Sequence, residues 1–201
     1  GVVRVPDTRI GRLAAMFQPK KTTYAQIQFV DSGAAGHGGG KPGKGPDMFA
    51  GVRNCDALVG VVRDFQNPAV PTVNGVEAAR DLRNLEAELI LNDLAIVETR
   101  MERIEKELRI GKKQGEREHQ LLSRLKAVLE AERPLRAETF DGDEQKLLRG
   151  FQLLSRKPLA VVYNRDDQAA GPLPAAGPGL LAVALQALTE REIIALPADE
   201  R

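Results

Sequence analysis

The chain has 201 residues, of which 42% are hydrophobic and 28% charged, so it can bury one sizeable core or one core plus a satellite element. Its net charge of +1 argues neither for a general nucleic-acid binder nor for an acidic tail. Its single Cys55 excludes an intramolecular disulfide, as is typical of a reducing compartment. No apolar run approaches the roughly 18 residues that span a bilayer, and no signal peptide precedes Gly1, so we expect a cytoplasmic protein without membrane contact.

The first third of the chain predicts short strands and one helix. Val2–Val5 has the pattern of a strand, and because the chain opens on Gly1 rather than Met, we expect it to be the interior of a larger protein. Thr8–Phe17 carries apolar side chains on one face, which predicts an amphipathic helix. A second strand is predicted over Gln26–Val30. A third follows over Leu58–Val62, whose near-continuous apolar run is typical of a parallel strand covered on both faces.

A glycine-rich segment, residues 37–46, follows the strand that ends at Asp31. Its stretch Gly38–Lys44 fits the pattern G-x-x-x-x-G-K of a phosphate-binding loop. However, Gly45 leaves no hydroxyl for Mg²⁺ where that loop has Ser or Thr, and Pro42 lacks one of the backbone N–H donors. We therefore favour a glycine-rich loop without a phosphate site. Asp31, at the tip of a buried strand, either faces a bound magnesium or caps a turn.

The middle of the chain predicts a long helical hairpin. Neither Gly nor Pro interrupts residues 77–110, and apolar residues recur there every seven positions in two series offset by three. The series are Ala87, Leu94, Met101 and Leu108, and Ile90, Val97 and Ile104. Two glycines in Gly111–Gly115 supply a turn, and a second apolar-striped helix follows and ends before Pro134. We expect an antiparallel coiled-coil hairpin with a solvated charged face.

The last part of the chain returns to short elements. We predict a strand over Leu159–Tyr163, a helix over Leu180–Leu188 and a strand over Ile193–Leu196. Strands that alternate with helices predict an α/β fold with a mostly parallel sheet. The expected domains are therefore an α/β domain in 1–75 and 158–201 and an inserted helical hairpin in 76–157.

In their order along the chain, these segments resemble the YchF or Obg-like ATPase family, a branch of the Obg-related P-loop nucleotidases. The residues that carry the resemblance are Gly1–Asp7, Arg12–Ala14, Phe17, Pro19–Lys21, Gln28–Asp31, Asn54–Val59, Val61–Arg63, Phe65, Pro68, Arg80–Asp81, Glu86–Leu91, Asp93–Leu94, Lys157–Pro158 and Asn164. The resemblance implies an ATP-hydrolysing switch that uses Mg²⁺ and is linked to the ribosome. It also implies that the family's phosphate loop would precede this chain and that its ubiquitin-like domain would follow it.

The resemblance implies that residues 31–38 correspond to the family's second switch in a degenerate form. The family's D-x-A-G-L becomes Asp31-Ser32-Gly33-Ala34-Ala35, in which Asp31 would hold Mg²⁺ through water. Ala34 replaces the glycine whose N–H reaches the γ-phosphate in the family. His37 stands where the family usually has lysine, beside Gly38, and we favour a solvated loop histidine over a catalytic one. We assign no catalytic residue from the sequence.

The resemblance also implies a base-reading loop. The family's N-x-x-E becomes Asn164-Arg165-Asp166-Asp167, closer to the N-K-x-D of GTPases, with Arg165 at the lysine position. A carboxylate at Asp167 would accept hydrogen bonds from a ring N–H and an exocyclic amine, which favours guanine over adenine. The backbone of Ala198 aligns with a further base contact. The alternative is a polar turn after a strand, which Asn and Asp also favour.

Two hypotheses follow for the function. The first is a nucleotide-dependent switch that binds ATP or GTP with Mg²⁺, although this chain alone would be inactive without the phosphate loop. The second is a degenerate relative that no longer hydrolyses nucleotide and acts as a scaffold, its hairpin contacting RNA, the ribosome or a partner helix. Ala34 favours the second hypothesis.

Overall fold

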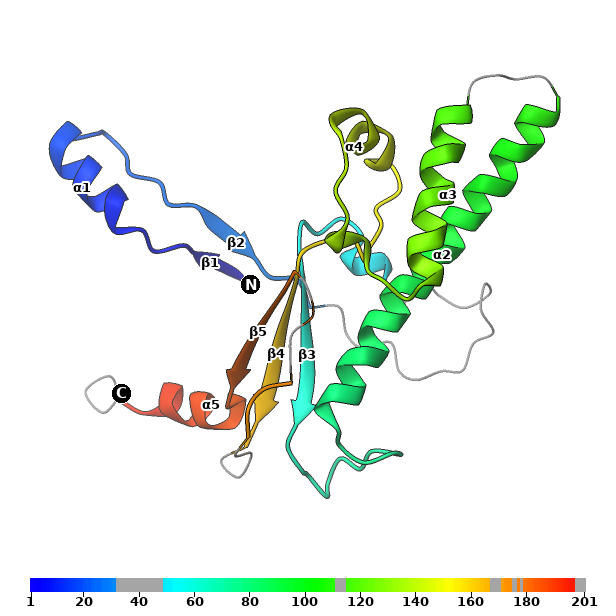
Figure 1. Cartoon of the computed structure of the whole chain (residues 1–201). Coiled ribbons are helices and arrows are strands. Elements are labelled where there is room, and N and C mark those ends of the chain that lie inside the picture. The colour runs from blue at the N-terminus through cyan, green and yellow to red at the C-terminus, as the bar shows by residue number, and fades with distance from the viewer. Residues whose placement is uncertain (32–48, 111–114, 167–170, 175–176, 178, 198–201) are drawn as a thin grey trace. The chain divides into compact units, whose positions relative to one another are not determined.

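A computed structural model describes residues 1–31, 49–110, 115–166, 171–174, 177 and 179–197. They fall into two compact units, Gly1–Arg53 and Asn54–Arg201. The order of the elements is drawn in Figure 1. Among the described residues, no helix combines the length and the apolar character that crossing a bilayer requires.

The described residues of the first unit form two strands and one helix. β1 (Val2–Arg4) pairs antiparallel with β2 (Gln26–Gln28), and α1 (Thr8–Phe17) lies between them in sequence. The carboxylate of Asp7 caps α1 by accepting a hydrogen bond from the backbone N–H of Arg9 at 2.9 Å. The predicted helix is thus confirmed at both ends, whereas the second strand is shorter than predicted. A 3-10 turn, η1 (Ala50–Val52), ends this unit.

A parallel three-stranded sheet forms the base of the second unit. β3 (Leu58–Asp64), β4 (Leu159–Arg165) and β5 (Leu180–Leu185) lie side by side in the order β3-β4-β5 (Figure 1). The predicted α/β fold with a mostly parallel sheet is confirmed. Buried and exposed side chains alternate along the first part of β3, and buried and half-buried ones alternate along β4. The apolar run of β3 had predicted a strand covered on both faces, but the described residues cover only one face of it.

The C-terminal elements differ from the prediction. Residues predicted as a helix form β5, and Ile193 and Ile194, predicted within a strand, belong to α5 (Ala187–Ala195). Leu180–Leu185 is rich in Ala and Leu, which favour helices, but it gains a full register of backbone hydrogen bonds against β4. Only the tertiary pairing decides such a short apolar run, because its periodicity fits either structure.

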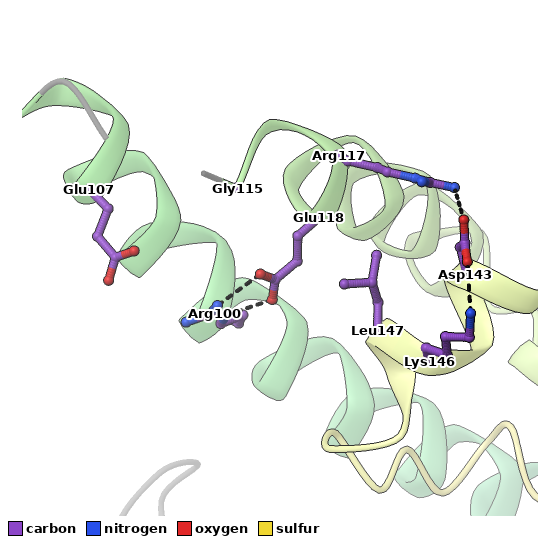
Figure 2. Close-up of a pocket in the computed structure, with 8 residues that line it drawn as sticks. All are labelled: Arg100, Glu107, Gly115, Arg117, Glu118, Asp143, Lys146 and Leu147. Atoms are coloured by element: carbon purple, nitrogen blue, oxygen red, sulfur yellow. Dashed lines mark hydrogen bonds and ion pairs between the residues drawn. The ribbon is translucent and has the colours of Figure 1, made fainter. Parts of the chain in front are cut away.

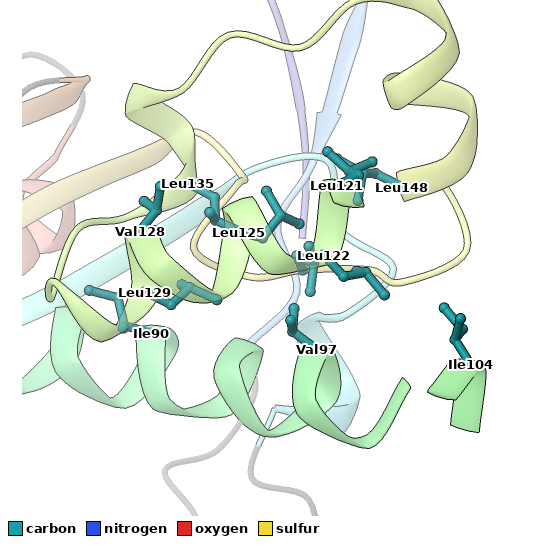
Figure 3. Packing of buried hydrophobic residues seen from close by; sticks show 11 residues of the cluster. Ile90, Val97, Ile104, Leu121, Leu122, Leu125, Val128, Leu129, Leu135 and Leu148 are labelled. Carbon is teal, nitrogen blue, oxygen red and sulfur yellow. The ribbon is translucent and has the colours of Figure 1, made fainter. Parts of the chain in front are cut away.

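The predicted hairpin helices are confirmed. α2 (Ala78–Arg109) and α3 (Glu116–Glu130) pack antiparallel, with 3-10 turn η2 (Leu135–Ala137) and short helix α4 (Gly142–Leu148) after them. Their buried core (Figure 3) comprises Ile90, Val97, Ile104, Leu121, Leu122, Leu125, Val128, Leu129, Leu135, Leu148 and Leu153. Gly115, the residue before α3, has a φ of 142°, a conformation that favours glycine.

A buried aspartate joins the hairpin to the segment that leads into β4. The Asp93 carboxylate of α2 is fully buried. It accepts hydrogen bonds from the backbone N–H of Leu154 at 2.8 Å, the backbone N–H of Ser155 at 2.7 Å and the Ser155 hydroxyl at 2.6 Å. Charge-assisted bonds of this kind are strong in a dry interior. They fix where the chain leaves the hairpin and enters the sheet.

Candidate functional site

The carboxyl ends of the three parallel strands form the candidate site. Ligands of open α/β sheets bind outside this edge, where the strands end and the loops begin. Here β3 ends in Arg63 and Asp64, and β4 ends in Asn164 and Arg165. The parallel register places Asp64 directly opposite Arg165 and Asn164 opposite Leu185. The edge therefore concentrates charged and amide side chains on a sheet whose strands are otherwise apolar.

Asn164 links the end of β4 to the start of the last helix. Its Oδ1 accepts a hydrogen bond from the backbone N–H of Ala187, the first residue of α5, at 3.1 Å. The first N–H groups of a helix have no partner within the helix, so this side chain satisfies one of them. This hydrogen bond therefore joins the end of β4, where the predicted base-reading motif starts, to the first residue of α5.

Arg165 spans the candidate site from one strand to the next. Its Nε donates to Oδ2 of Asp64 at 2.9 Å, and its Nη1 donates to the carbonyl oxygen of Gly171 at 2.9 Å. The two side chains are 15% and 25% exposed, so the ion pair is largely removed from water. Sequence reasoning selected Arg165 but missed Asp64, because the partner of a strand end depends on the register between strands.

Arg63 organises the loop that follows β3. Its guanidinium donates to the carbonyl oxygens of Phe65 at 2.9 Å, Val70 at 2.7 Å and Asn67 at 3.3 Å. It also lies over the Phe65 ring at 4.8 Å from the centroid. Arg63 therefore stabilises the loop beside the candidate site. Its guanidinium donates to carbonyl oxygens of the protein and not to a ligand.

Several predicted site residues lie outside the described residues. They are Ala34, His37, Gly38, Asp167 and Ala198. Asp31 is described, in the first unit, with an exposed side chain. Within the described part of the chain, no three His, Cys, Asp or Glu side chains gather as metal ligands. One exposed carboxylate fits the sparse protein ligation of a nucleotide-bound Mg²⁺, which takes most ligands from phosphates and water.

A buried ion pair and a buried tyrosine lie near the base of the hairpin. Arg136 of η2 has a side chain only 4% exposed and donates to the Glu86 carboxylate of α2. Burial lowers the pKa of Arg136, against the effect of Glu86. Tyr163, next to Asn164 in β4, is fully buried, and burial with the nearby charges of Asp64 and Glu86 raises the pKa of its hydroxyl. The charge of Glu86, at the base of the hairpin, therefore acts on Tyr163 of the strand that ends in the candidate site.

A separate depression of about 720 Å³ lies on the hairpin (Figure 2). Its charged side chains form ion pairs with one another, Arg100 with Glu118 at 2.7 Å and Arg117 with Asp143 at 3.2 Å. The Glu118 carboxylate raises the pKa of Arg100. The remaining lining residues are Glu107, Gly115, Lys146 and Leu147. Three cations face three carboxylates, so this depression offers an anionic nucleotide no excess of positive charge.

The chain is similar along its whole length to proteins of established name. It is 33% identical over 214 residues to Ribosome-binding ATPase YchF of Bacillus subtilis and 30% identical over 211 residues to that of Haemophilus ducreyi, each match covering 100% of this chain and 58% of the relative. The solved structure of the Schizosaccharomyces pombe YchF GTPase matches with a TM-score of 0.71 at 22% identity, over 99% of this chain and 58% of that one. No family model matches the chain. The chain thus spans 58% of the length of these relatives.

Proposed function

Since the chain belongs to the YchF family, as its resemblance in sequence predicted, we propose that it supplies the base-reading and hairpin parts of a ribosome-linked, purine-nucleotide-dependent switch. The observation that carries the proposal is the polar edge of the parallel sheet, where Asn164 and Arg165 are held in place by hydrogen bonds. The ligand would be ATP or GTP with Mg²⁺. Ribosome association would place the protein in the cytoplasm.

Each predicted site residue has a role in this proposal. Asn164 supports the base-reading loop, Arg165 lies beside the base, and Asp167 accepts hydrogen bonds from its ring N–H and exocyclic amine. The backbone of Ala198 adds a further contact to the base. Asp31 holds Mg²⁺ through water, within a switch loop formed by Ala34, His37 and Gly38.

The proposed division of labour follows the domains predicted from the sequence. Residues 1–75 and 158–201 would bind nucleotide, and residues 76–157 would form the hairpin that contacts ribosome or RNA. The stretch Gly38–Lys44, which fits the pattern of a phosphate loop, is followed by Gly45 in place of Ser or Thr and lacks a backbone N–H donor at Pro42. We therefore expect the 201-residue chain alone to bind ATP or GTP with no measurable affinity by calorimetry, because phosphate contacts supply much of the binding free energy. Micromolar binding by this chain would contradict the proposed arrangement.

The base-reading role is tested in the full-length protein with Asp167→Asn. An amide cannot accept both hydrogen bonds from a guanine edge, so the ratio of the Kd values for ATP and GTP should change by about 10-fold or more. Affinity for inorganic tripolyphosphate, which has no base, should stay the same. Asp56→Asn, an exposed aspartate at the amino end of β3, is the matched control. An unchanged ratio would remove Asp167 from the base site.

The second candidate function is a scaffold that binds nucleotide without hydrolysing it. The specific observation in its favour is Ala34, at the place of the glycine whose N–H serves the γ-phosphate in the family. Single-turnover hydrolysis by the full-length protein, with and without Ala34→Gly, separates the two functions. Hydrolysis by the unaltered protein supports the switch. Hydrolysis only after Ala34→Gly supports the scaffold.

A further inference from the structure

A second depression, of about 360 Å³, lies where the chain leaves the hairpin. It is lined by polar, aromatic and apolar side chains from η2, α4 and the segments beside them: Leu135, Arg136, Glu138, Thr139, Phe140, Gln145 and Arg156. Arg136 pairs with Glu86, outside the lining. Glu138 pairs with Arg133, also outside it, at 3.2 Å. Arg156 therefore leaves this depression with an excess of positive charge, unlike the depression in Figure 2.

The guanidinium of Arg156 contacts an aromatic ring and no carboxylate. Its central carbon lies over the Phe140 ring, 5.3 Å from the centroid. Among the described residues, neither an ion pair nor a hydrogen bond engages this guanidinium. A guanidinium that lies over an aromatic face keeps the N–H donors in its own plane for other partners. Phe140 thus orients Arg156 without using its hydrogen bonds.

The backbone on both sides of this contact is fixed. Ser155, the residue before Arg156, donates its backbone N–H and its hydroxyl to the buried Asp93 carboxylate at 2.7 and 2.6 Å. Phe140 packs against the hairpin core, and the next residue, Asp141, caps α4 with its carboxylate. A donor that is already held in place loses little conformational entropy when its ligand binds. The depression is therefore prepared for an anion before the anion arrives.

A phosphate group fits the donors that the depression offers. The guanidinium of Arg124 in α3 lies 5.6 Å from the same ring centroid, but Glu144 pairs with it at 3.0 Å. Arg156 is thus the guanidinium left for a ligand, and its fork of N–H groups matches two oxygens of a phosphate. The exposed Thr139, which also lines the depression, has a hydroxyl that can donate to another oxygen.

We propose that Arg156, held over Phe140, binds a backbone phosphate of RNA, so that the base of the hairpin contacts ribosomal RNA. The inference rests on the proposed function, in which the hairpin part of the chain contacts ribosome or RNA, and it names the donor and the group that this donor binds. The contact is independent of base sequence, because a phosphate carries no sequence information.

The test uses the full-length protein and the fluorescence anisotropy of a labelled oligouridylate over a series of salt concentrations. Arg156→Gln should weaken binding by about 10-fold, with an unchanged Tm, and should lower the slope of log Kd against log salt concentration by about 0.7, as expected for one lost phosphate contact. Arg156→Lys keeps the charge but not the planar fork, so it should restore the slope and only part of the affinity. Arg191→Gln removes the same charge from the exposed surface of α5 and should leave the slope unchanged.

Co-sedimentation with purified bacterial ribosomes separates this inference from the function on which it rests. If the unaltered protein does not sediment with ribosomes, the proposed function and the inference are both wrong. If it sediments but does not bind oligouridylate, or if Arg156→Gln binds oligouridylate as the unaltered protein does, only the inference is wrong. Equal losses in Arg156→Gln and Arg191→Gln would point to net charge and overturn it too. Binding of a polyglutamate peptide in place of oligouridylate, lost in Arg156→Gln, would make the partner an acidic protein and also overturn it.

Discussion

The hairpin and the sheet use the same apolar residues but bury them differently. Val97 of α2 and Leu125 of α3 are 0% exposed, whereas Val59 and Val61 of β3 are 50% and 69% exposed. Each hairpin helix supplies the partner surface of the other, and the two are neighbours in sequence. A sheet has two faces and needs a layer on each of them. Within the described residues the face of β3 that carries Val59 and Val61 stays exposed, so the hairpin is the more self-sufficient region.

The strongest test of this comparison is Asp93, which joins the two regions. Asp93→Ala leaves two backbone N–H groups and the Ser155 hydroxyl without their acceptor in a dry interior. We expect a loss of about 3–5 kcal/mol in the free energy of unfolding. Denaturant unfolding measures it, with Glu102→Ala on the exposed face of the same helix as control. A loss below about 1 kcal/mol would mean that the hairpin and the entry to β4 are not coupled through this carboxylate.

The difference in burial is tested directly by truncating one residue in each region. Leu125→Ala opens a cavity in the hairpin core and should cost about 3 kcal/mol. Val61→Ala removes atoms that are already mostly in water and should change the stability by less than about 0.5 kcal/mol. Both are read from denaturant midpoints under the same conditions. Equal losses would show that the exposed face of β3 is buried in solution, against the comparison.

The covered face of β3 is probed by Gly60→Ala. A Cβ at Gly60 would lie 2.5 Å from Cδ2 of Leu85 in α2, closer than side-chain atoms approach. The Leu85 side chain must move, at a cost of about 1–2 kcal/mol. In a cycle with Leu85→Ala, the effect of Gly60→Ala should shrink, because the conflicting methyl group is gone. If the losses in stability of Gly60→Ala and Leu85→Ala simply add in the double variant, α2 lies farther from β3 than this contact implies.

A small effect is expected for the ion pairs of the hairpin. Arg100 and Glu118 are 33% and 17% exposed, so removing Arg100 should cost only about 0.5 kcal/mol. The loss should shrink further at 1 M salt, where exposed charges are screened. Thermal unfolding of Arg100→Ala at low and high salt measures both effects. A loss as large as that of Leu125→Ala would mean that the charged surface of the hairpin contributes as much to its stability as the apolar core does.

The sequence selected two of the residues at the polar edge of the sheet. Asn164 and Arg165 were selected because they follow a buried strand and match a family motif, and the structure describes both at the carboxyl edge of the sheet. Asp64, Gly171 and Ala187, which hold them, could not be selected. Each is far from its partner in sequence, and no local pattern encodes the contact. Residues that belong to a motif can be found in the sequence, whereas the residues that position them are found only in the folded structure.

The sequence by itself determined the hairpin, the first helix and the α/β class. These depend on local signals, the seven-residue apolar repeat of residues 77–110 and the apolar run of β3, which are legible without any partner. Only the tertiary structure decided that Leu180–Leu185 is a strand, that Asp64 faces Arg165, and that Asp93 accepts three hydrogen bonds. The physical reason is the range of the interaction: a heptad seam is read along one helix, whereas strand register and buried polar contacts join residues that only the folded chain brings together.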